Sequence, residues 1–271
     1  MANAIPSDYV LGYSDAEQDR LIRQATLLAP ITERFFREAG IGAGCHVLDI
    51  GSGMGDVAMI AARLVGASGE VLGIEQNASF AARARARVAA MGFRNVSFIQ
   101  ADANGLAVEG PFDAVVGRLV LNHNPDPVAM LRSVRQLLIP AGVVAFQEIA
   151  ASPAVAVAAG LPLWSRVVTR IQDMIHKSGM KPDAGLALHR IFQEAGFPGP
   201  HIHLDVPFTQ DASIAQLEVD LLRSLAGYHG ASLADLGDPE TLVKRIHNEA
   251  ASTRTATGFM AIVSAWSRKI G

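Results

Sequence analysis

The sequence has few of the features that tie a protein to an oxidising compartment, to nucleic acid or to a membrane. It holds one cysteine, Cys45, in 271 residues, so no disulfide can form within the chain. With a formal net charge of −3 at pH 7, the chain has no excess of positive charge with which to bind nucleic acid. The longest apolar stretch, 150–163, is broken by serine, glycine and proline and is too short to cross a bilayer. These absences favour a soluble globular chain.

The first residues also lack the basic segment and apolar core of a secretory signal peptide. We therefore expect a cytoplasmic protein with no membrane partner and no nucleic-acid partner. The one local excess of basic charge, Arg83, Arg85 and Arg87, alternates with alanines, and a solvated helix face explains it.

A metal site is not indicated, because no Cys/His spacing fits zinc. His201, His203 and Asp205 do alternate along one expected strand, which places all three on one face. We interpret this as a solvated face, opposite an apolar one. That apolar face would carry Ile202, Leu204 and Val206.

The middle of the chain alternates apolar runs with amphipathic stretches, which predicts a parallel sheet with helices on both faces. We expect strands at 46–50, 71–75, 96–100, 113–119 and 143–149. We expect helices at 55–66, 78–91 and 127–138. Asp126 followed by Pro127 is typical of a helix start, with Asp as the cap and Pro in the first turn.

The two ends of the chain are expected to be largely helical. Ser14 and Glu17 form a predicted capping box, and Pro30 is expected to break or kink the helix that they begin. The expected parts are a helical cover at 1–40, an α/β core at 41–204, a helical insertion or lid at 205–257, and a last core strand at 258–271.

The stretch 47–58 is the most informative part of the sequence. An apolar run ends in Asp49, and Gly51, Gly53 and Gly55 follow before an amphipathic segment begins. This layout of strand, tight turn and helix start lets bare backbone approach a nucleoside-containing ligand. Glu75 then closes the next apolar run.

These residues resemble the first motif of the class I S-adenosylmethionine-dependent methyltransferases. The stretches 112–123 and 137–143 resemble that superfamily's fourth strand and its turn into the fifth strand. The chain is most similar to the small-molecule branch, of the ubiquinone/menaquinone-biosynthesis type, over about residues 40–150. The resemblance implies a Rossmann-like, doubly wound α/β fold and S-adenosyl-L-methionine as the cofactor.

The resemblance also implies roles for particular side chains. Asp49 would meet the amino group of the cofactor, and Glu75 both ribose hydroxyls. Asp102 would accept from the adenine amino group, and Ala103 would pack on the ring. The expected cofactor residues are Asp49, Gly51, Ser52, Gly53, Gly55, Glu75, Gln76, Asp102, Ala103, Arg118 and Tyr13.

His123 is the candidate catalytic base, because it follows the fourth strand and its ordinary pKa suits proton transfer. A polar turn that caps the next helix explains the same residue. Arg118 would bind an acidic group or pair with a carboxylate. Tyr9 and Tyr13 would fold over the cofactor or pack on the core.

The reaction implied is direct in-line displacement of the methyl group by a small-molecule acceptor. The apolar stretch 155–175 suggests a hydrophobic acceptor, although a homodimer interface would explain it too. Two other readings stay open. One is a methyltransferase fold that binds the cofactor without methyl transfer. The other is an NAD-dependent oxidoreductase, whose Gly-x-Gly-x-x-Gly spacing this chain does not have.

Overall fold

A computed structural model describes residues 11–12, 14–103, 108–158 and 160–270. The chain divides into two compact units, each built from separate stretches of sequence. The first comprises Met1–Gln24, Ile149–Asp183 and Val206–Ala261, and the second comprises Ala25–Glu148, Ala184–Asp205 and Ile262–Gly271. We call them the helical unit and the sheet unit.

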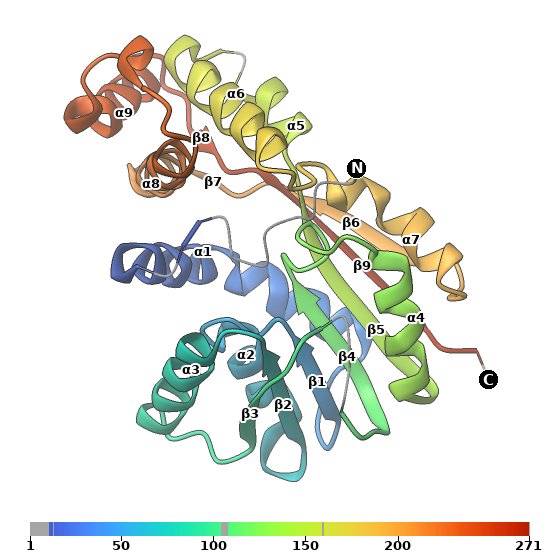
Figure 1. Ribbon diagram of the computed structural model, residues 1–271. Helices are drawn as coiled ribbons and strands as arrows, with labels where there is room; N and C mark the ends of the chain where they lie inside the picture. Colours follow the sequence, from blue (N-terminus) through green and yellow to red (C-terminus); the bar gives the residue numbers. More distant parts are fainter. Residues whose placement is uncertain (1–10, 13, 104–107, 159, 271) are drawn as a thin grey trace. The chain divides into compact units, whose positions relative to one another are not determined.

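The main sheet has seven strands in the order β3-β2-β1-β4-β5-β9-β6 (Figure 1). The pairs among β1 to β5 are parallel, whereas β6 is antiparallel to β9. The mostly parallel sheet confirms the predicted fold class. The strands are β1 (His46–Ile50), β2 (Glu70–Glu75), β3 (Val96–Gln100), β4 (Phe112–Arg118), β5 (Leu138–Ala150), β6 (His201–Asp205) and β9 (Ala261–Arg268).

Helices connect the parallel strands because a parallel pair needs a crossover. They are α2 (Asp56–Val65), α3 (Ala78–Ala90) and α4 (Pro127–Leu137). The predicted cap of α4 is confirmed, since Asp126 Oδ1 accepts from the Ala129 N–H at 2.9 Å and Pro127 lies in the first turn. Each helix returns the chain so that the carboxyl ends of β1, β2 and β4 lie at one edge of the sheet.

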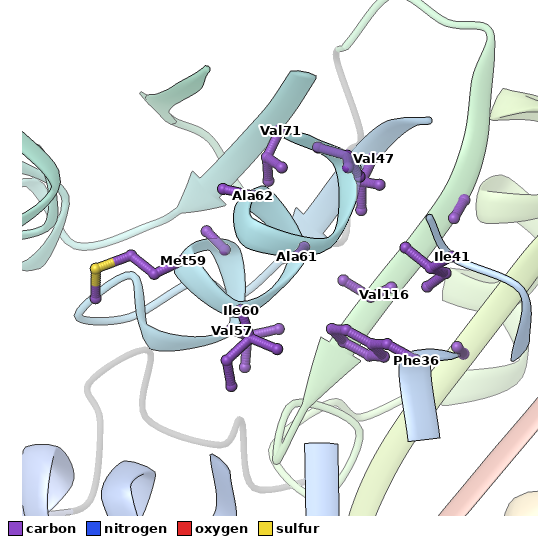
Figure 2. Close-up of a cluster of buried hydrophobic side chains, with 14 of the residues drawn as sticks. Phe36, Ile41, Val47, Val57, Met59, Ile60, Ala61, Ala62, Val71 and Val116 are labelled. Atoms are coloured by element: carbon purple, nitrogen blue, oxygen red, sulfur yellow. The ribbon is translucent and has the colours of Figure 1, made fainter. Parts of the chain in front are cut away.

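The core of the sheet unit forms where α2 packs on the sheet (Figure 2). Val57, Ile60 and Ala61 of α2 meet Val47 of β1 and Val116 of β4. All of these side chains are almost fully buried. This burial on both sides explains why the strand sequences read as continuous apolar runs rather than alternating ones.

Two expected boundaries differ from the structure. Helix α1 (Asp15–Ala39) continues through Pro30, so the proline does not end it. Strand β5 begins at Leu138, before the expected 143, because Leu138 already pairs with Phe112. An irregularity follows, and the regular register resumes where Val143 pairs with Ala114.

The helical unit is built mainly from helices that follow β5 and β6. These are α5 (Ser152–Val157), α6 (Pro162–Lys177), α8 (Ser213–His229) and α9 (Leu242–Ser252), with a two-stranded sheet of β7 (Phe208–Thr209) and β8 (Thr257–Gly258). Glu249 of α9 accepts from the N–H groups of Leu163 and Trp164 at 2.8 and 3.0 Å, and so caps α6. The expected role of 205–257 as a lid stays a prediction.

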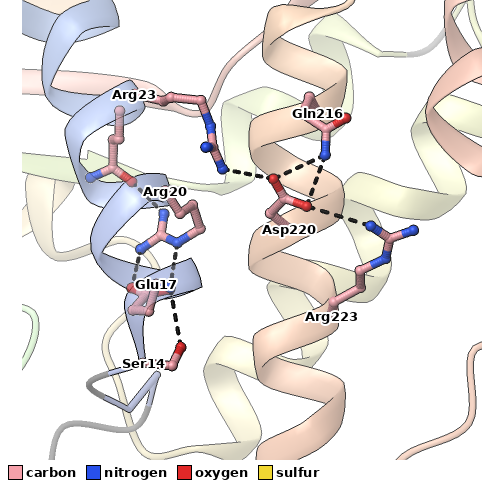
Figure 3. Close-up of polar contacts among 8 residues, drawn as sticks. Ser14, Glu17, Arg20, Arg23, Gln216, Asp220 and Arg223 are labelled. Carbon is pink, nitrogen blue, oxygen red and sulfur yellow. Dashed lines mark hydrogen bonds and ion pairs between the residues drawn. The ribbon is translucent and has the colours of Figure 1, made fainter.

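Polar contacts join α8 to the first turns of α1 (Figure 3). Ser14 Oγ accepts from the Glu17 N–H at 3.2 Å, whereas the Glu17 carboxylate pairs with Arg20 at 2.6 Å. Arg23 reaches Asp220 of α8 at 2.9 Å. Arg20 and Glu17 are buried, so this pair is shielded from water.

Helix α7 (Leu188–Glu194) completes the set of α-helices in the described ranges. Across those ranges, every helix is too short or too polar to pass through a lipid bilayer.

Candidate functional site

The glycines after β1 adopt backbone conformations that other residues rarely take. Gly51, Gly53 and Gly55 have φ angles of 65°, 51° and 80°. A Cβ at Gly51 would lie 2.7 Å from Val120 Cγ2, so the turn is packed closely there. At Gly53 the nearest atom would be 4.0 Å away, so its backbone borders open space. Gly53 is therefore the point in the turn where a ligand can approach the main chain.

Asp49, near the end of β1, is a buried carboxylate without an ordinary hydrogen bond. It is 1% exposed, and neither carboxylate oxygen has a hydrogen-bond partner in the described chain. Burial raises its pKa to about 8, against the opposing effects of the Arg118 guanidinium and the Ala58 backbone N–H. A buried carboxylate lowers the stability of the fold unless a cation or a hydrogen-bond donor pairs with it. A ligand ammonium group would supply that partner.

Glu75 links the end of β2 to the glycine turn. Its Oε2 accepts from the Gly53 N–H at 2.9 Å, and its Oε1 accepts from the Asn77 N–H at 2.8 Å. Burial raises the pKa of Glu75, while the N–H groups of Asn77 and Gly53 oppose that shift. Each oxygen keeps a second lone pair, which a diol could use. The neighbouring Gln76 is exposed.

The other residues of the turn and of β3 lie at the same edge. Ser52 is buried, its N–H donates to the Ile74 carbonyl at 2.9 Å, and its hydroxyl has no partner in the described chain. Asp102 is exposed and Ala103 half-buried just after β3, which pairs with β2. The expected adenine contacts therefore follow the strand next to Glu75.

Arg118 ends β4 beside Asp49 and Asp56, whose charges favour its protonated form. Its Nη1 donates to Thr32 Oγ1 at 3.0 Å, and the Thr32 hydroxyl reaches Gln147 Oε1 at 2.7 Å. Burial lowers the pKa of Arg118. The side chain is thus fixed by a hydroxyl, while its charge acts on the Asp49 carboxyl.

His123 lies in the loop between β4 and α4. Its side chain reaches solvent, yet the protein atoms crowded around it hinder hydration of the charged ring. This desolvation lowers its pKa to about 4, so the ring is neutral at pH 7. A neutral imidazole can accept a proton, but a pKa of about 4 makes it a weaker base than the ordinary value on which the expected role was based, and that role stays a prediction.

Glu148 holds this loop, and the sequence analysis missed it. Its buried carboxylate accepts from the N–H groups of Val120 and Leu121 at 2.8 and 2.7 Å, and from Asn122 at 3.3 Å. The loop begins at Leu119, which has an unusual φ of 59°. The sequence hint was an acidic residue in an otherwise apolar strand, which burial makes expensive unless donors surround it.

Two expected contributors fall outside the part of the chain that the structure describes. Tyr9 and Tyr13 both lie among the residues left undescribed at the start of the chain. Their expected place over the cofactor stays a prediction.

The residues of β6 are largely exposed on both faces of the strand. His201 stacks on Trp266 with ring centroids 4.2 Å apart, and Asp205 pairs with Arg34 at 2.6 Å. His201 and His203 are exposed, in line with the expected solvated face, and Ile202 and Leu204 on the opposite face are also 42% and 52% exposed. An edge strand has a neighbour on one side only, which leaves these side chains uncovered.

Two basic residues on α3 have structural partners. Arg87 pairs with Asp56 at 2.8 Å, and Arg85 donates to the Phe98 carbonyl at 2.9 Å. These contacts fix α3 against the sheet, so Arg85 and Arg87 do more than form the solvated helix face expected from the sequence.

Comparison with protein families matches residues 41–196 to a family described as a methyltransferase domain. This range covers β1 to β5 and the site residues from Asp49 to Glu148. An arsenite methyltransferase of Aquipseudomonas alcaligenes is 40% identical over 114 residues, which are 39% of this chain and 33% of that protein. The ubiquinone/menaquinone biosynthesis C-methyltransferase UbiE of Cellvibrio japonicus is 37% identical over 113 residues, 41% of this chain and 45% of that protein. The matches thus span less than half of these curated relatives.

Solved structures share the fold at low sequence identity. A SAM-dependent methyltransferase from Aquifex aeolicus has a TM-score of 0.52 and 16% identity, over 72% of this chain and 92% of that one. The cyclase SpnF has a TM-score of 0.57 and 17% identity, over 90% of this chain and 82% of that one. The glycine turn, the acidic strand ends and the family match lead to one conclusion. The chain belongs to the methyltransferase domain family, and its fold is that of the class I S-adenosylmethionine-dependent methyltransferases.

Proposed function

We propose that this protein transfers a methyl group from S-adenosyl-L-methionine to a small, largely hydrophobic organic acceptor. One observation carries the cofactor assignment. The buried Asp49 carboxylate has no hydrogen-bond partner in the described chain and lies in the strand that leads into the open turn at Gly53. Glu75 bonds to that same turn.

The residues of the site fit the groups that this cofactor presents. Asp49 would bind the ammonium group, whose charge offsets the cost of burying the carboxylate. The backbone around Gly53 would receive the amino-acid tail, and Glu75 would accept from the ribose hydroxyls. Asp102 and Ala103 would meet the adenine. When bound, the cofactor supplies a methyl group on sulfonium, which is already activated for displacement.

The protein's contribution to the reaction would be to position the acceptor and exclude water. Proximity and orientation supply ~7–11 kcal/mol of a barrier of this kind. His123 would remove the proton when the acceptor is a hydroxyl or a carbon acid, which contributes ~10²–10⁴-fold. Its pKa of about 4 leaves the ring free to accept at neutral pH.

The apolar stretch at 155–175 is not used as support for the hydrophobic acceptor. Trp164, Val167 and Val168 of that stretch are at most 5% exposed, so they pack the helical unit. Similarity to UbiE supports an organic ring acceptor. Arsenite fits less well, because soft metal-like ions favour several thiolates and the sequence holds only Cys45.

A second candidate is a protein that binds the cofactor and catalyses a different reaction. The likeness to SpnF supports it, since that structure is described as a 4+2 cyclase. A shared fold does not fix the chemistry. Cofactor binding with no labelled product across a broad acceptor panel would favour this candidate.

The cofactor site is tested by titration calorimetry and thermal unfolding with S-adenosylhomocysteine. Micromolar binding is expected for the native protein, and Glu75→Ala should abolish it. Glu70→Ala is the matched control, because Glu70 begins the same strand and is exposed. NAD should not raise the melting temperature. A folded protein that ignores S-adenosylhomocysteine would contradict the proposal.

The acceptor is then sought with methyl-labelled cofactor and a panel of phenols, quinols and amines. Arsenite with excess thiol forms a separate arm. We expect label in an aromatic acceptor and none in arsenic. Transfer to arsenite alone would overturn the organic-acceptor proposal and leave the cofactor assignment intact.

A further inference from the structure

The outer edge of β6 is an exposed strand with apolar side chains. β6 is the last strand of the sheet, and in the described ranges it pairs with β9 only. Its outer N–H and C=O groups are therefore open to another strand. Proteins usually protect such edges with lysine, a bulge or a covering element. Here Ile202 and Leu204 stay about half exposed instead.

The two faces of β6 differ. On one face, His203 lies 3.4 Å from Glu38 and Asp205 lies 2.6 Å from Arg34, both on α1. On the other face, Ile202 and Leu204 pair with Ala265 and Val263 of β9. Those two β9 residues are covered, at 0% and 3% exposure. The apolar layer of the sheet therefore continues onto β6, where the described residues leave it about half exposed.

We propose that β6 pairs with β6 of a second copy of this chain, in antiparallel register about a two-fold axis at His203. The sequence from His201 to Asp205 is complementary to itself in this register. His201 lies opposite Asp205 of the second copy, so an imidazole N–H meets a carboxylate. Ile202 lies opposite Leu204 of the second copy, so apolar side chains meet on the other face.

The flanking prolines select this register. Pro200 and Pro207 bound the segment, and neither can donate a backbone hydrogen bond. Any other register must differ from this one by an even number of residues, because an odd shift would place the apolar face of one strand beside the polar face of the other. Only the register centred on His203 pairs all five strand residues. A shift by two would set Leu204 against itself and move His201 opposite Pro207.

This pairing would join two seven-stranded sheets into one continuous sheet. Each copy contributes the same patch, as in isologous two-fold dimers. A five-residue strand makes a small interface, so association is expected between ~1 µM and ~1 mM protein. The proposal does not depend on the acceptor or on catalysis.

The oligomeric state is tested by sedimentation over that concentration range. The native chain should shift from one chain mass toward two, and Leu204→Lys should stay a monomer because it places like charges near the axis. Met91→Lys is the matched control, since Met91 is 58% exposed and follows α3, whose helix contacts β3 at the opposite edge. Its dimerisation should match the native protein. Retained S-adenosylhomocysteine binding or an unchanged circular dichroism spectrum confirms that each variant is folded.

The register is tested by cross-linking. Opposed residues of antiparallel strands have Cα atoms ~4.5–5.5 Å apart, which suits a disulfide. Under mild oxidation His203→Cys should therefore form a covalent dimer several-fold faster than Ile202→Cys. In the Ile202→Cys dimer the two cysteines would lie diagonally across the strand pair, farther apart than directly opposed residues. The native protein, with Cys45, gives the background rate. A monomer at every concentration, or a dimer that Leu204→Lys leaves intact, would overturn the proposal.

Discussion

At the level of single residues, the site has two energetically unfavourable features whose cost a bound ligand would reduce. Asp49 is buried without a hydrogen bond in the described chain, and Gly53 holds a positive φ next to open space. Neither feature improves packing. Both are explained when a charged ligand with a slender tail binds there.

Replacing Gly53 with alanine should separate backbone strain from ligand exclusion. The left-handed φ costs about 1–2 kcal/mol for a residue with a Cβ. The new methyl group would also occupy the space beside the turn, so affinity for S-adenosylhomocysteine should fall at least about tenfold. Calorimetry and thermal unfolding measure the two effects.

Gly230→Ala is the control for this change. Gly230 is left-handed, with φ 59° and ψ 30°, and has nothing within 4 Å of its added Cβ, at the end of α8. Stability should fall by a similar amount with binding unchanged. Equal binding by both variants would mean that the space at Gly53 is not used by the ligand.

Binding of S-adenosylhomocysteine should release a proton from Asp49. With a pKa of about 8, Asp49 is mostly protonated at neutral pH, whereas pairing with an ammonium group requires the carboxylate. Affinity should therefore rise with pH toward about pH 8, and it should fall again once the ligand's own ammonium group loses its proton. Calorimetry in buffers of different ionisation enthalpy measures the proton count.

The Asp49→Asn variant supplies the comparison. It should lose about 2–5 kcal/mol of binding free energy, because the ligand's ammonium group loses its partner. Proton release near neutral pH should disappear with it. If the variant releases as many protons as the native protein, another group titrates on binding.

At the scale of elements, the loop after β4 is held by the strand beside it. Glu148 of β5 accepts from three successive N–H groups, and Val120 in that loop packs on Gly51. One carboxylate thus fixes both the loop that carries His123 and one wall of the glycine turn.

Glu148→Gln keeps the size of the side chain but replaces one acceptor oxygen by an NH₂ donor. We expect a loss of about 1–3 kcal/mol in stability and faster hydrogen exchange at 120–122. Binding of S-adenosylhomocysteine should weaken because Val120 no longer fixes the turn. Glu218→Gln, another buried acid, should leave exchange at 120–122 unchanged.

At the scale of the molecule, two buried carboxyl groups make stability depend on pH. Burial raises the pKa of Asp49 to about 8 and that of Glu218, beside Arg20, to about 7. The unfolded chain loses these two protons near pH 4, whereas below about pH 6.5 it holds one on His123 that the folded state lacks. The two carboxyl groups outweigh that one proton, so between about pH 4 and 8 the folded state holds more protons. The free energy of unfolding should therefore decrease as the pH rises through this range.

Urea unfolding of the ligand-free protein at several pH values measures how the free energy of unfolding changes with pH. The double variant Asp49→Asn, Glu218→Gln should show a flatter profile. Saturating S-adenosylhomocysteine should flatten it as well, by supplying the Asp49 carboxylate with a partner. A native profile that rises from about pH 5 to 8 would contradict the assignment of these groups.

Features that depend on neighbours along the chain can be predicted from the order of the amino acids. Asp49, the glycine turn and Asp126 of α4 lie within a few residues of the backbone they serve, so spacing reveals them. The parallel sheet followed from apolar runs separated by helices, because strands covered on both faces must be apolar throughout. Class I methyltransferase membership followed from the same local motifs.

Contacts between residues far apart in sequence could be found only from the folded chain. Glu148 bonds to N–H groups 26 to 28 positions earlier, and Arg118 bonds to Thr32, 86 positions away. Such pairs leave no periodic pattern in a single sequence. The exposure of Ile202 and Leu204 was equally hidden, because alternation predicts which residues share a face but not whether another element covers that face.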